Sequence, residues 1–225
     1  MLDGSTPCCE AKPLNTLQRP IRAGTGHRER SWEVVLTSNL NKAQRDRLID
    51  IVKARSFQQG GEVRLASGRT SSFYFNMKPT MMHPEGAFLI GTLIAERLHG
   101  EAIDMVGGLE MGAVPLATAV AAVSGQQGAK PLPAFFVRKQ SKEHGTQALI
   151  EGLAPGESMA GKSLCVVEDV TTTGTSALKA VDALREAGAD VALVLTIVDR
   201  REGASDAFAA AGVAFDAILT VDDFK

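Results

Sequence analysis

The segment 164–176 combines side chains and a spacing that are suited to binding a sugar phosphate. An apolar stretch, 164–167, precedes two acids, Glu168 and Asp169, and then a loop rich in hydroxyl groups. Such a loop points backbone N–H groups at an anion where a helix begins, and a glycine lets the backbone approach a phosphate closely. Because carboxylates repel phosphate, the two acids suit the hydroxyl groups of a ribose beside it. The candidate phosphate-binding residues are Val170, Thr171, Thr172, Thr173, Gly174, Thr175 and Ser176.

The same segment allows a plainer interpretation, in which the acids are solvated at a strand end and the threonines form an ordinary helix cap. The joint occurrence of the acid pair and the helix-opening loop favours a ligand site. No Gly-Lys-Ser/Thr follows the strand, which excludes a Walker P-loop, and the dinucleotide fingerprint is absent from this segment too. Cys165, inside the apolar stretch, is interpreted as a small core residue rather than a nucleophile.

A second segment, 138–146, concentrates positive charge. A polyanionic leaving group needs such a concentration, because negative charge grows on its oxygen as the bond to carbon breaks. By itself, the run is more typical of a solvated surface, so it supports catalysis only together with the phosphate-binding segment. Its four cationic or donor side chains within seven residues are Arg138, Lys139, Lys142 and His144.

The elements that must position these segments follow an α/β pattern. Short apolar strands alternate with helices of about ten residues or more, which predicts a parallel sheet flanked by helices on both faces. Ligands in such sheets bind beyond the carboxyl ends of the strands. The predicted strands are 103–106, 134–137, 164–167, 191–198 and 215–221, and the predicted helices are 84–98, 114–123, 177–187 and 204–211.

A helix and a small antiparallel hood are predicted before this alternation. Ser38 or Asn39 is the expected N-cap of a helix that runs to about Phe57, with Gly60-Gly61 as its stop. Apolar and polar residues then alternate within 63–77 on both sides of a turn, as they do in paired strands.

The predicted organisation is a single domain over 37–225, with the hood mainly at 37–80 and the core at about 84–225. Residues 1–36 show no periodicity and are predicted to be a poorly ordered N-terminal extension. A transit peptide is an alternative for this arginine-containing stretch, but its acidic residues argue against that, and it lacks the apolar run of a secretory signal.

The composition excludes several classes of partner. With 44% hydrophobic and 22% charged residues, the chain can bury a large core, and its net charge of −2 gives no basic field. We therefore expect no nucleic acid and no membrane as partners. No stretch approaches the roughly 18 consecutive apolar residues of a membrane span. Three cysteines without metal-ligand spacing indicate a reducing, cytoplasmic location.

The segment 164–176 resembles the phosphoribosyl-pyrophosphate motif of type I phosphoribosyltransferases. The segment 138–146 resembles the mobile catalytic loop of orotate phosphoribosyltransferases, and 67–76 resembles their base-site segment. Together with Asp199-Arg200, the similarity covers about 39–221. The resemblance implies a parallel-sheet core with an N-terminal hood, a homodimer and a requirement for Mg²⁺.

What the resemblance implies for activity is transfer of ribose 5-phosphate from 5-phosphoribosyl-1-pyrophosphate to orotate. The products are orotidine 5′-monophosphate and pyrophosphate, a step of de novo pyrimidine (UMP) biosynthesis. Mg²⁺ is expected to be held mainly through substrate and water, and the 138–146 loop to close over the site of the neighbouring subunit. The implied catalytic residues are Lys142, Lys139, His144 and Asp169. The implied substrate-binding residues are Arg138, Lys139, Lys142, His144, Glu168, Asp169, Val170 to Ser176, Arg200, Tyr74 and Phe75.

Two of these assignments have structural alternatives. In the family, the arginine at the position of Arg200 pairs with the orotate carboxylate, and a planar guanidinium suits that anion. A surface ion pair with Asp199 or Glu202 is the alternative. A structural role is the alternative for Phe75, because strand alternation puts it on one face with Phe73.

The segment 107–112 resembles the family's pyrophosphate loop, although its glycines alone are a weak signal. The sequence departs from a common bacterial pattern, in which lysines stand at the positions of Ala66 and Met111. Arg64 and Lys78, which are close along the chain, are the candidates to supply the missing charge.

Two other functions fit the phosphate-binding segment. A purine or uracil phosphoribosyltransferase would share the phosphate site but would not need Arg200. A non-catalytic phosphoribosyl-pyrophosphate sensor that regulates transcription would be expected to carry a nucleic-acid-binding module. The N-terminal extension is too short and unpatterned for a helix-turn-helix, and the loop lysines and histidine favour an enzyme.

Overall fold

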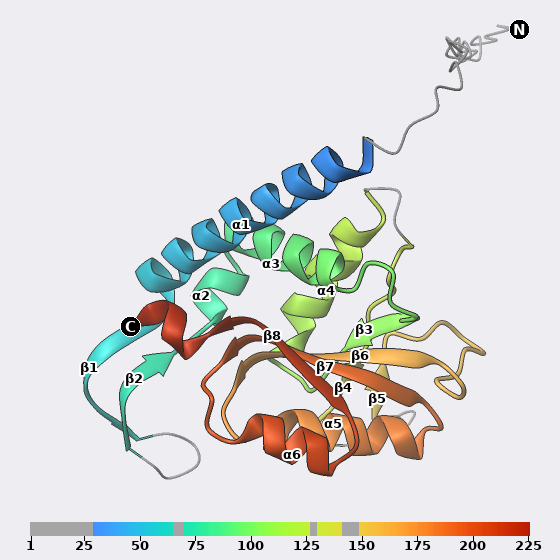
Figure 1. Cartoon of the computed structure of the whole chain (residues 1–225). Coiled ribbons are helices and arrows are strands. Elements are labelled where there is room, and N and C mark those ends of the chain that lie inside the picture. The colour runs from blue at the N-terminus through green and yellow to red at the C-terminus, as the bar shows by residue number, and fades with distance from the viewer. Residues whose placement is uncertain (1–28, 65–69, 127–129, 141–148) are drawn as a thin grey trace, which may run out of the picture.

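The centre of the computed structural model is a parallel sheet of four strands in the order β3-β6-β7-β8 (Figure 1). The structure describes residues 29–64, 70–126, 130–140 and 149–225. The sheet confirms the predicted α/β architecture, and its carboxyl edge carries the chemistry described below. The four strands are β3 (Met105–Gly107), β6 (Ser163–Thr171), β7 (Asp190–Asp199) and β8 (Ala214–Thr220).

Helices cover both faces of this sheet, as predicted. Two helices, α3 (Pro84–Arg97) and α4 (Ala113–Ser124), lie on one face, and α5 (Thr175–Glu186) and α6 (Ala204–Ala210) lie on the other (Figure 1). The long helix α1 (Glu29–Arg55) packs on α3. The structure also has two short helices. The helix α2 (Lys78–Met81) precedes α3, and the 3-10 helix η1 (Val221–Phe224) follows β8.

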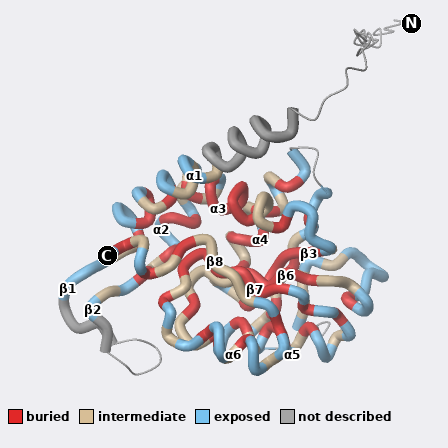
Figure 2. Tube along the Cα trace, in the orientation of Figure 1, coloured by how far each residue is buried: buried red, intermediate tan, exposed pale blue. Residues whose placement is uncertain are grey.

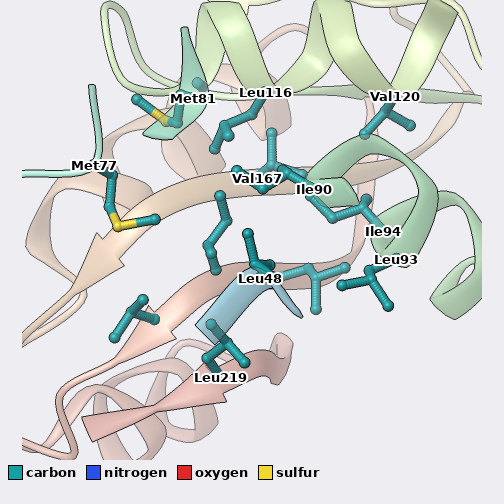
Figure 3. Packing of buried hydrophobic residues seen from close by; sticks show 14 of the residues in the cluster. Leu48, Met77, Met81, Ile90, Leu93, Ile94, Leu116, Val120, Val167 and Leu219 are labelled. Atoms are coloured by element: carbon teal, nitrogen blue, oxygen red, sulfur yellow. The ribbon is translucent and has the colours of Figure 1, made fainter. Parts of the chain in front are cut away.

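The core consists of two apolar layers separated by the sheet. On β6, Cys165 and Val167 face the α3–α4 layer, whereas Leu164 and Val166 face the α5–α6 layer, as strand alternation requires. Figure 2 shows the buried residues concentrated along the sheet and on the inner sides of the helices. Figure 3 shows one layer, in which Leu48 of α1 joins residues of α3, α4 and β6. Each fully buried aliphatic side chain contributes about 2 kcal/mol.

The hood is an antiparallel pair of strands, β1 (Phe57–Arg64) and β2 (Thr70–Phe75). Its inner face belongs to an aromatic cluster in which the ring of Phe75 lies 5.0 Å from those of Phe57 and Phe224. Because Phe224 lies in η1, the C-terminus of the chain holds the hood against the core. The pairing confirms the predicted strands at Val63 and at Phe73 and Phe75, whereas Leu65 lies outside the described residues and Met77 follows the end of β2.

The start of the first helix was predicted wrongly. The helix begins at Glu29 and not after Ser38 or Asn39. The physical reason is cooperativity: once a helix is nucleated, each added residue gains one hydrogen bond, and no proline or glycine interrupts 29–55. Residues 1–28 lie outside the described residues, so the extension over 1–36 stays a prediction for that part.

The stop of this helix was also misplaced. The helix ends at Arg55, and Gly60 lies in β1, where the strand pairing is irregular between Gln59 and Val63. Gly60 has a φ of 105°, a conformation that suits glycine at a bulge. In the part of the chain that the structure describes, no helix has the length and apolar character needed to cross a bilayer.

The predicted strand 134–137 is shorter than expected. Its ordered part is β4 (Phe136–Val137), which pairs antiparallel with β5 (Ile150–Glu151). Only single bridges, Val106 to Ala134 and Leu109 to Val137, connect it to the end of the main sheet. Two prolines, Pro131 and Pro133, precede it, and proline lacks the N–H that a ladder requires.

Candidate active site

The strand that leads into the site is longer than the sequence indicated. β6 continues to Thr171, four residues beyond the predicted end at Val167, because its last residues stay paired with β7. Glu168 pairs with Thr196 in the register, and Thr171 with Asp199. The two acids therefore lie inside a strand, and its alternation directs the Glu168 and Asp169 side chains to opposite faces.

Glu168 and the following loop line a hollow at the carboxyl edge of the sheet. The hollow has an empty volume of about 250 Å³, which includes space open to solvent. Among the described residues, no hydrogen-bond partner is found for two of its buried oxygens, Glu168 Oε2 and Thr171 Oγ1. Buried polar atoms are almost always paired, so these two oxygens indicate a place for a polar ligand or water. The lining residues are Glu168, Val170, Thr171, Thr172, Thr173, Gly174, Thr175, Ser176 and Ala177.

Gly174 gives the loop its shape. It precedes the first residue of α5 and adopts a left-handed conformation with φ 79°. A Cβ at this position would lie 2.8 Å from Cζ of Phe208, so the position has no room for a side chain. The first N–H groups of a helix lack partners within the helix and carry the positive end of its dipole. These features suit the binding of an anion, and phosphate binding by this loop stays a prediction.

Both acids have raised pKa values. Burial, together with the charge of Asp169, raises the pKa of Glu168 to about 8, although Lys139 acts in the opposite direction. Burial also raises the pKa of Asp169, while the N–H of Val170 and the ammonium groups of Lys78 and Lys139 lower it. Two neighbouring carboxylates with raised pKa values at a strand end are typical of a functional site.

Asp169 faces the loop that resembles the pyrophosphate loop. A Cβ on Gly112 would lie 2.9 Å from Oδ1 of Asp169, so the loop backbone lies directly against the carboxylate. The N–H of Lys139 donates to Oε1 of Glu110 at 2.9 Å, and the N–H of Glu110 donates to the carbonyl of Val137 at 2.8 Å. These bonds join the start of the cationic segment to the pyrophosphate-like loop.

Only part of the cationic segment can be placed. Lys142 and His144 lie outside the described residues, as does Ala66, where relatives often carry a lysine. Arg138 lies 3.7 Å from Glu151 in an ion pair and donates to the carbonyl of Gln140 at 3.3 Å.

Arg200 is buried at the end of β7, beside the hood. Its Nη2 lies 2.8 Å from Oε1 of Glu202, and its guanidinium carbon lies 4.6 Å from the ring centre of Phe73. The ion pair considered as an alternative therefore exists with Glu202, but it is an interior contact, because the Arg200 side chain is only 3% exposed. Asp199 instead accepts a hydrogen bond from the N–H of Arg201.

The two aromatic candidates of β2 differ in environment. Tyr74 is 37% exposed, whereas Phe75 is 5% exposed and packs in the aromatic cluster of the hood. Sequence reasoning did not assign a site role to Phe73 or Glu202, which both contact Arg200. The signal for Glu202 was its position two residues after Arg200, but the contact depends on the fold of the turn.

Comparisons with known proteins agree with this geometry. A family model described as the phosphoribosyl transferase domain matches residues 81–224. The chain is 58% identical over 182 residues to the orotate phosphoribosyltransferase of Rhodopseudomonas palustris (strain TIE-1), a match that covers 81% of this chain and 96% of that protein.

Solved structures with the same architecture include the orotate phosphoribosyltransferase of Mycobacterium tuberculosis H37Rv. Its complex with Fe(III) dicitrate aligns with a TM-score of 0.69 and 39% identity, covering 80% of this chain and 98% of that one. Its complex with 5-phospho-α-D-ribosyl 1-diphosphate aligns with a TM-score of 0.66 and 36% identity over the same shares, 80% and 98%. The chain therefore belongs to the type I phosphoribosyltransferase family and, within it, to the orotate phosphoribosyltransferases.

Proposed function

We propose that the chain transfers the ribose 5-phosphate group of 5-phosphoribosyl-1-pyrophosphate to N1 of orotate. The products are orotidine 5′-monophosphate and pyrophosphate, as in de novo pyrimidine biosynthesis. The observation that carries the proposal is the hollow over the β6–α5 turn, which joins a helix start suited to an anion to a buried oxygen of Glu168 that has no partner among the described residues. A phosphate beside a polyol satisfies both features, and a ribose 5-phosphate contains both groups.

The β6–α5 turn binds the 5-phosphate in this proposal. Backbone N–H groups at the start of α5 and the hydroxyl groups of Thr173 and Thr175, which lie 3.0 Å apart, donate to the phosphate oxygens. Glu168 accepts from a ribose hydroxyl inside the hollow. Asp169, on the other face of β6, orients the ribose near C1 and stabilises the positive charge that develops there as pyrophosphate departs.

The pyrophosphate end lies against the 107–112 loop. The backbone N–H of Lys139 donates to Glu110 of this loop, which holds the start of the cationic segment beside it. Lys142 and His144 are the further members of that segment. These groups stabilise the negative charge that grows on the departing oxygen as the C1–O bond breaks. Orotate N1 gives up its proton to pyrophosphate or solvent as it forms the new bond to C1, the electron pair of the broken C1–O bond leaves with pyrophosphate, and no covalent enzyme intermediate is involved. Closure of the 138–146 loop, which would exclude water that could otherwise capture the ribosyl cation, stays a prediction.

Arg200 and Tyr74 bind the base. The guanidinium of Arg200 faces the hood at the end of β7, where it can pair with the carboxylate of orotate. Tyr74 is half-exposed on the outer face of β2 and supplies a flat surface for the pyrimidine ring. Phe75 acts indirectly, because it packs in the cluster that holds β2 in place.

Mg²⁺ fits the charges of this site. Glu168 and Asp169 provide two neighbouring carboxylates, one with an unpartnered buried oxygen, whereas Mg²⁺ requires six oxygen ligands. Ribose hydroxyls, pyrophosphate oxygens and water would therefore complete the coordination, with the acids beside them. The chemistry that Mg²⁺ would supply there is partial neutralisation of the pyrophosphate charge.

The proposal includes a homodimer in the cytoplasm. Two large apolar side chains of the α2–α3 region, Met82 and Phe88, are exposed in the single chain. A second copy of the chain could cover these two side chains. Action of the 138–146 loop across the interface stays a prediction.

An orotate-consumption assay tests the proposed activity. Ultraviolet absorbance follows the loss of orotate in the presence of phosphoribosyl pyrophosphate and Mg²⁺, and uracil and hypoxanthine serve as competing bases. We expect turnover of orotate alone, and a fall in kcat by about a hundredfold in Lys142→Ala, the scale for one transition-state donor. Turnover of hypoxanthine or uracil in place of orotate would contradict the assignment.

A further inference from the structure

We propose that Glu202 and Phe73 are positioning residues that hold Arg200 in the orientation needed to bind the orotate carboxylate. Glu202 fixes one edge of the guanidinium and Phe73 fixes one face. The inference rests on the proposed role of Arg200 in base binding, and it assigns a specificity function to two residues outside the phosphate-binding and cationic segments.

The backbone after β7 is folded to bring Glu202 back onto Arg200. Arg201 adopts a left-handed conformation with φ 54°, the single non-glycine residue with a positive φ in the described part of the chain. Its N–H donates to Oδ1 of Asp199 at 2.8 Å, and its guanidinium pairs with Asp222 at 2.6 Å. A left-handed non-glycine residue is unfavourable unless the surroundings hold it, and these two bonds do so.

The ion pair lies in the interior. Nη2 of Arg200 is 2.8 Å from Oε1 of Glu202, and the two side chains are 3% and 21% exposed. A buried charge is costly unless it is paired, so Glu202 permits Arg200 to stay inside the site without substrate. A guanidinium carries five N–H donors, so it can bind Glu202 and a substrate carboxylate at the same time.

Phe73 covers one face of the Arg200 guanidinium. The guanidinium carbon lies 4.6 Å from the ring centre, within the range of a cation–π contact. Phe73 also packs edge-on against Phe75, at 6.0 Å between ring centres and 76° between planes, which supports the position of its ring. The substrate must then approach the edge of Arg200 rather than the face that Phe73 covers.

Two opposing effects of Glu202 can be separated by substitution. Its acceptor oxygen positions Arg200, whereas its negative charge repels an incoming carboxylate. Glu202→Gln keeps an acceptor and removes the charge, and Glu202→Ala removes both. If positioning is the role of Glu202, only the alanine variant weakens orotate binding.

The experiment measures KM for orotate, KM for phosphoribosyl pyrophosphate and kcat in the full-length protein. We expect Glu202→Ala to raise KM for orotate by roughly tenfold, with the other two parameters unchanged. Glu202→Gln should have a KM for orotate at or below the wild-type value. Phe73→Leu, which keeps an apolar side chain without the π face, should raise KM for orotate by about threefold. Glu186→Ala, on the exposed end of α5, is the matched control.

Several results would overturn the inference. A normal KM for orotate in Glu202→Ala, or equal losses in Glu202→Gln and Glu202→Ala, would remove the positioning role. Parallel changes in kcat and in both KM values would indicate general structural damage. Failure of the proposed function is distinguishable, because wild-type protein would then show no orotate turnover, or Arg200→Lys would leave KM for orotate unchanged.

Discussion

Two turns at the carboxyl edge of the same sheet are built in opposite ways. Glu168 and Thr171, at the end of β6, carry the buried oxygens Oε2 and Oγ1, for which the described residues provide no partner. Around the turn after β7, charged groups are paired: Arg201 bonds to Asp199 and pairs with Asp222 of η1, and Arg200 pairs with Glu202.

The difference indicates what each turn does before substrate arrives. The end of β6 holds buried polar oxygens and carboxylates with raised pKa values, which costs stability until a ligand or water pairs with them. Arg200 and Arg201 at the β7–α6 turn are ion-paired within the protein, which lowers the cost of holding a buried arginine there. We infer that the first turn supplies affinity for phosphoribosyl pyrophosphate and the second supplies selection of the base.

The largest expected effect comes from adding a side chain at Gly174, in the β6–α5 turn. Gly174→Ala places a methyl group 2.8 Å from Phe208 at a left-handed position, so the loop must move. We expect kcat/KM for phosphoribosyl pyrophosphate to fall by on the order of a hundredfold, the scale of a displacement of about 1 Å. Gly156→Ala is the control, because Gly156 has a φ of 86° but its Cβ would meet no atom within 4 Å. Similar losses in both variants would show that strain alone is responsible.

The next largest effect tests whether the β7–α6 turn acts on orotate without affecting phosphoribosyl pyrophosphate. Arg200→Lys keeps the positive charge but loses the planar fork that binds a carboxylate through two hydrogen bonds. We expect KM for orotate to rise by about thirtyfold, equivalent to about 2 kcal/mol, while KM for phosphoribosyl pyrophosphate stays constant. Steady-state kinetics with each substrate varied in turn provide the measurement. A change in both KM values would mean that the two turns are not functionally distinct.

A smaller effect concerns stability and its dependence on pH. Glu168 titrates near its ordinary value in the unfolded chain, whereas its folded pKa is about 8. The folded protein therefore binds the proton more tightly, and this group makes folding less favourable as pH rises from about 4.5 towards 8. We expect Glu168→Gln to raise Tm by more at high pH than at pH values near 5, at the expense of activity. Thermal unfolding of the wild-type protein and of Glu168→Gln between about pH 4.5 and 8 tests this expectation. An equal shift in Tm at every pH would contradict it.

The smallest effect addresses the charge missing at Ala66 and Met111. Lys78 acts on the same carboxylate, Asp169, that faces the pyrophosphate-like loop. We therefore expect Lys78→Ala to raise KM for phosphoribosyl pyrophosphate by about fivefold, the scale of one partly exposed charge contact.

Arg64→Ala and Lys53→Ala complete this comparison. Lys53 is exposed on α1 and serves as the control, and Arg64 is the other candidate from the sequence. A normal KM for phosphoribosyl pyrophosphate in both Lys78→Ala and Arg64→Ala would show that neither residue replaces the missing lysines.

Local patterns predicted most of the elements correctly. The alternation of apolar strands and helices gave the parallel sheet, and Pro84 marked the first residue of α3. The interpretation of Cys165 as a core residue is confirmed by its complete burial, which raises its pKa to about 12. Errors occurred at boundaries, such as Glu29 for α1 and Thr171 for β6, because cooperative propagation and cross-strand pairing extend elements beyond their local signals.

The sequence by itself determined the chemical type of the proposed phosphate site, because the acids, hydroxyl groups and Gly174 are contiguous between a strand and a helix. Only the tertiary structure decided which side chains meet from distant segments. The contact of Arg200 with Phe73, and the position of Gly112 against Asp169, depend on how the hood and the loops pack on the sheet. A local pattern encodes hydrogen-bond and dipole geometry within a few residues, whereas contacts between segments are fixed by burial of the whole core.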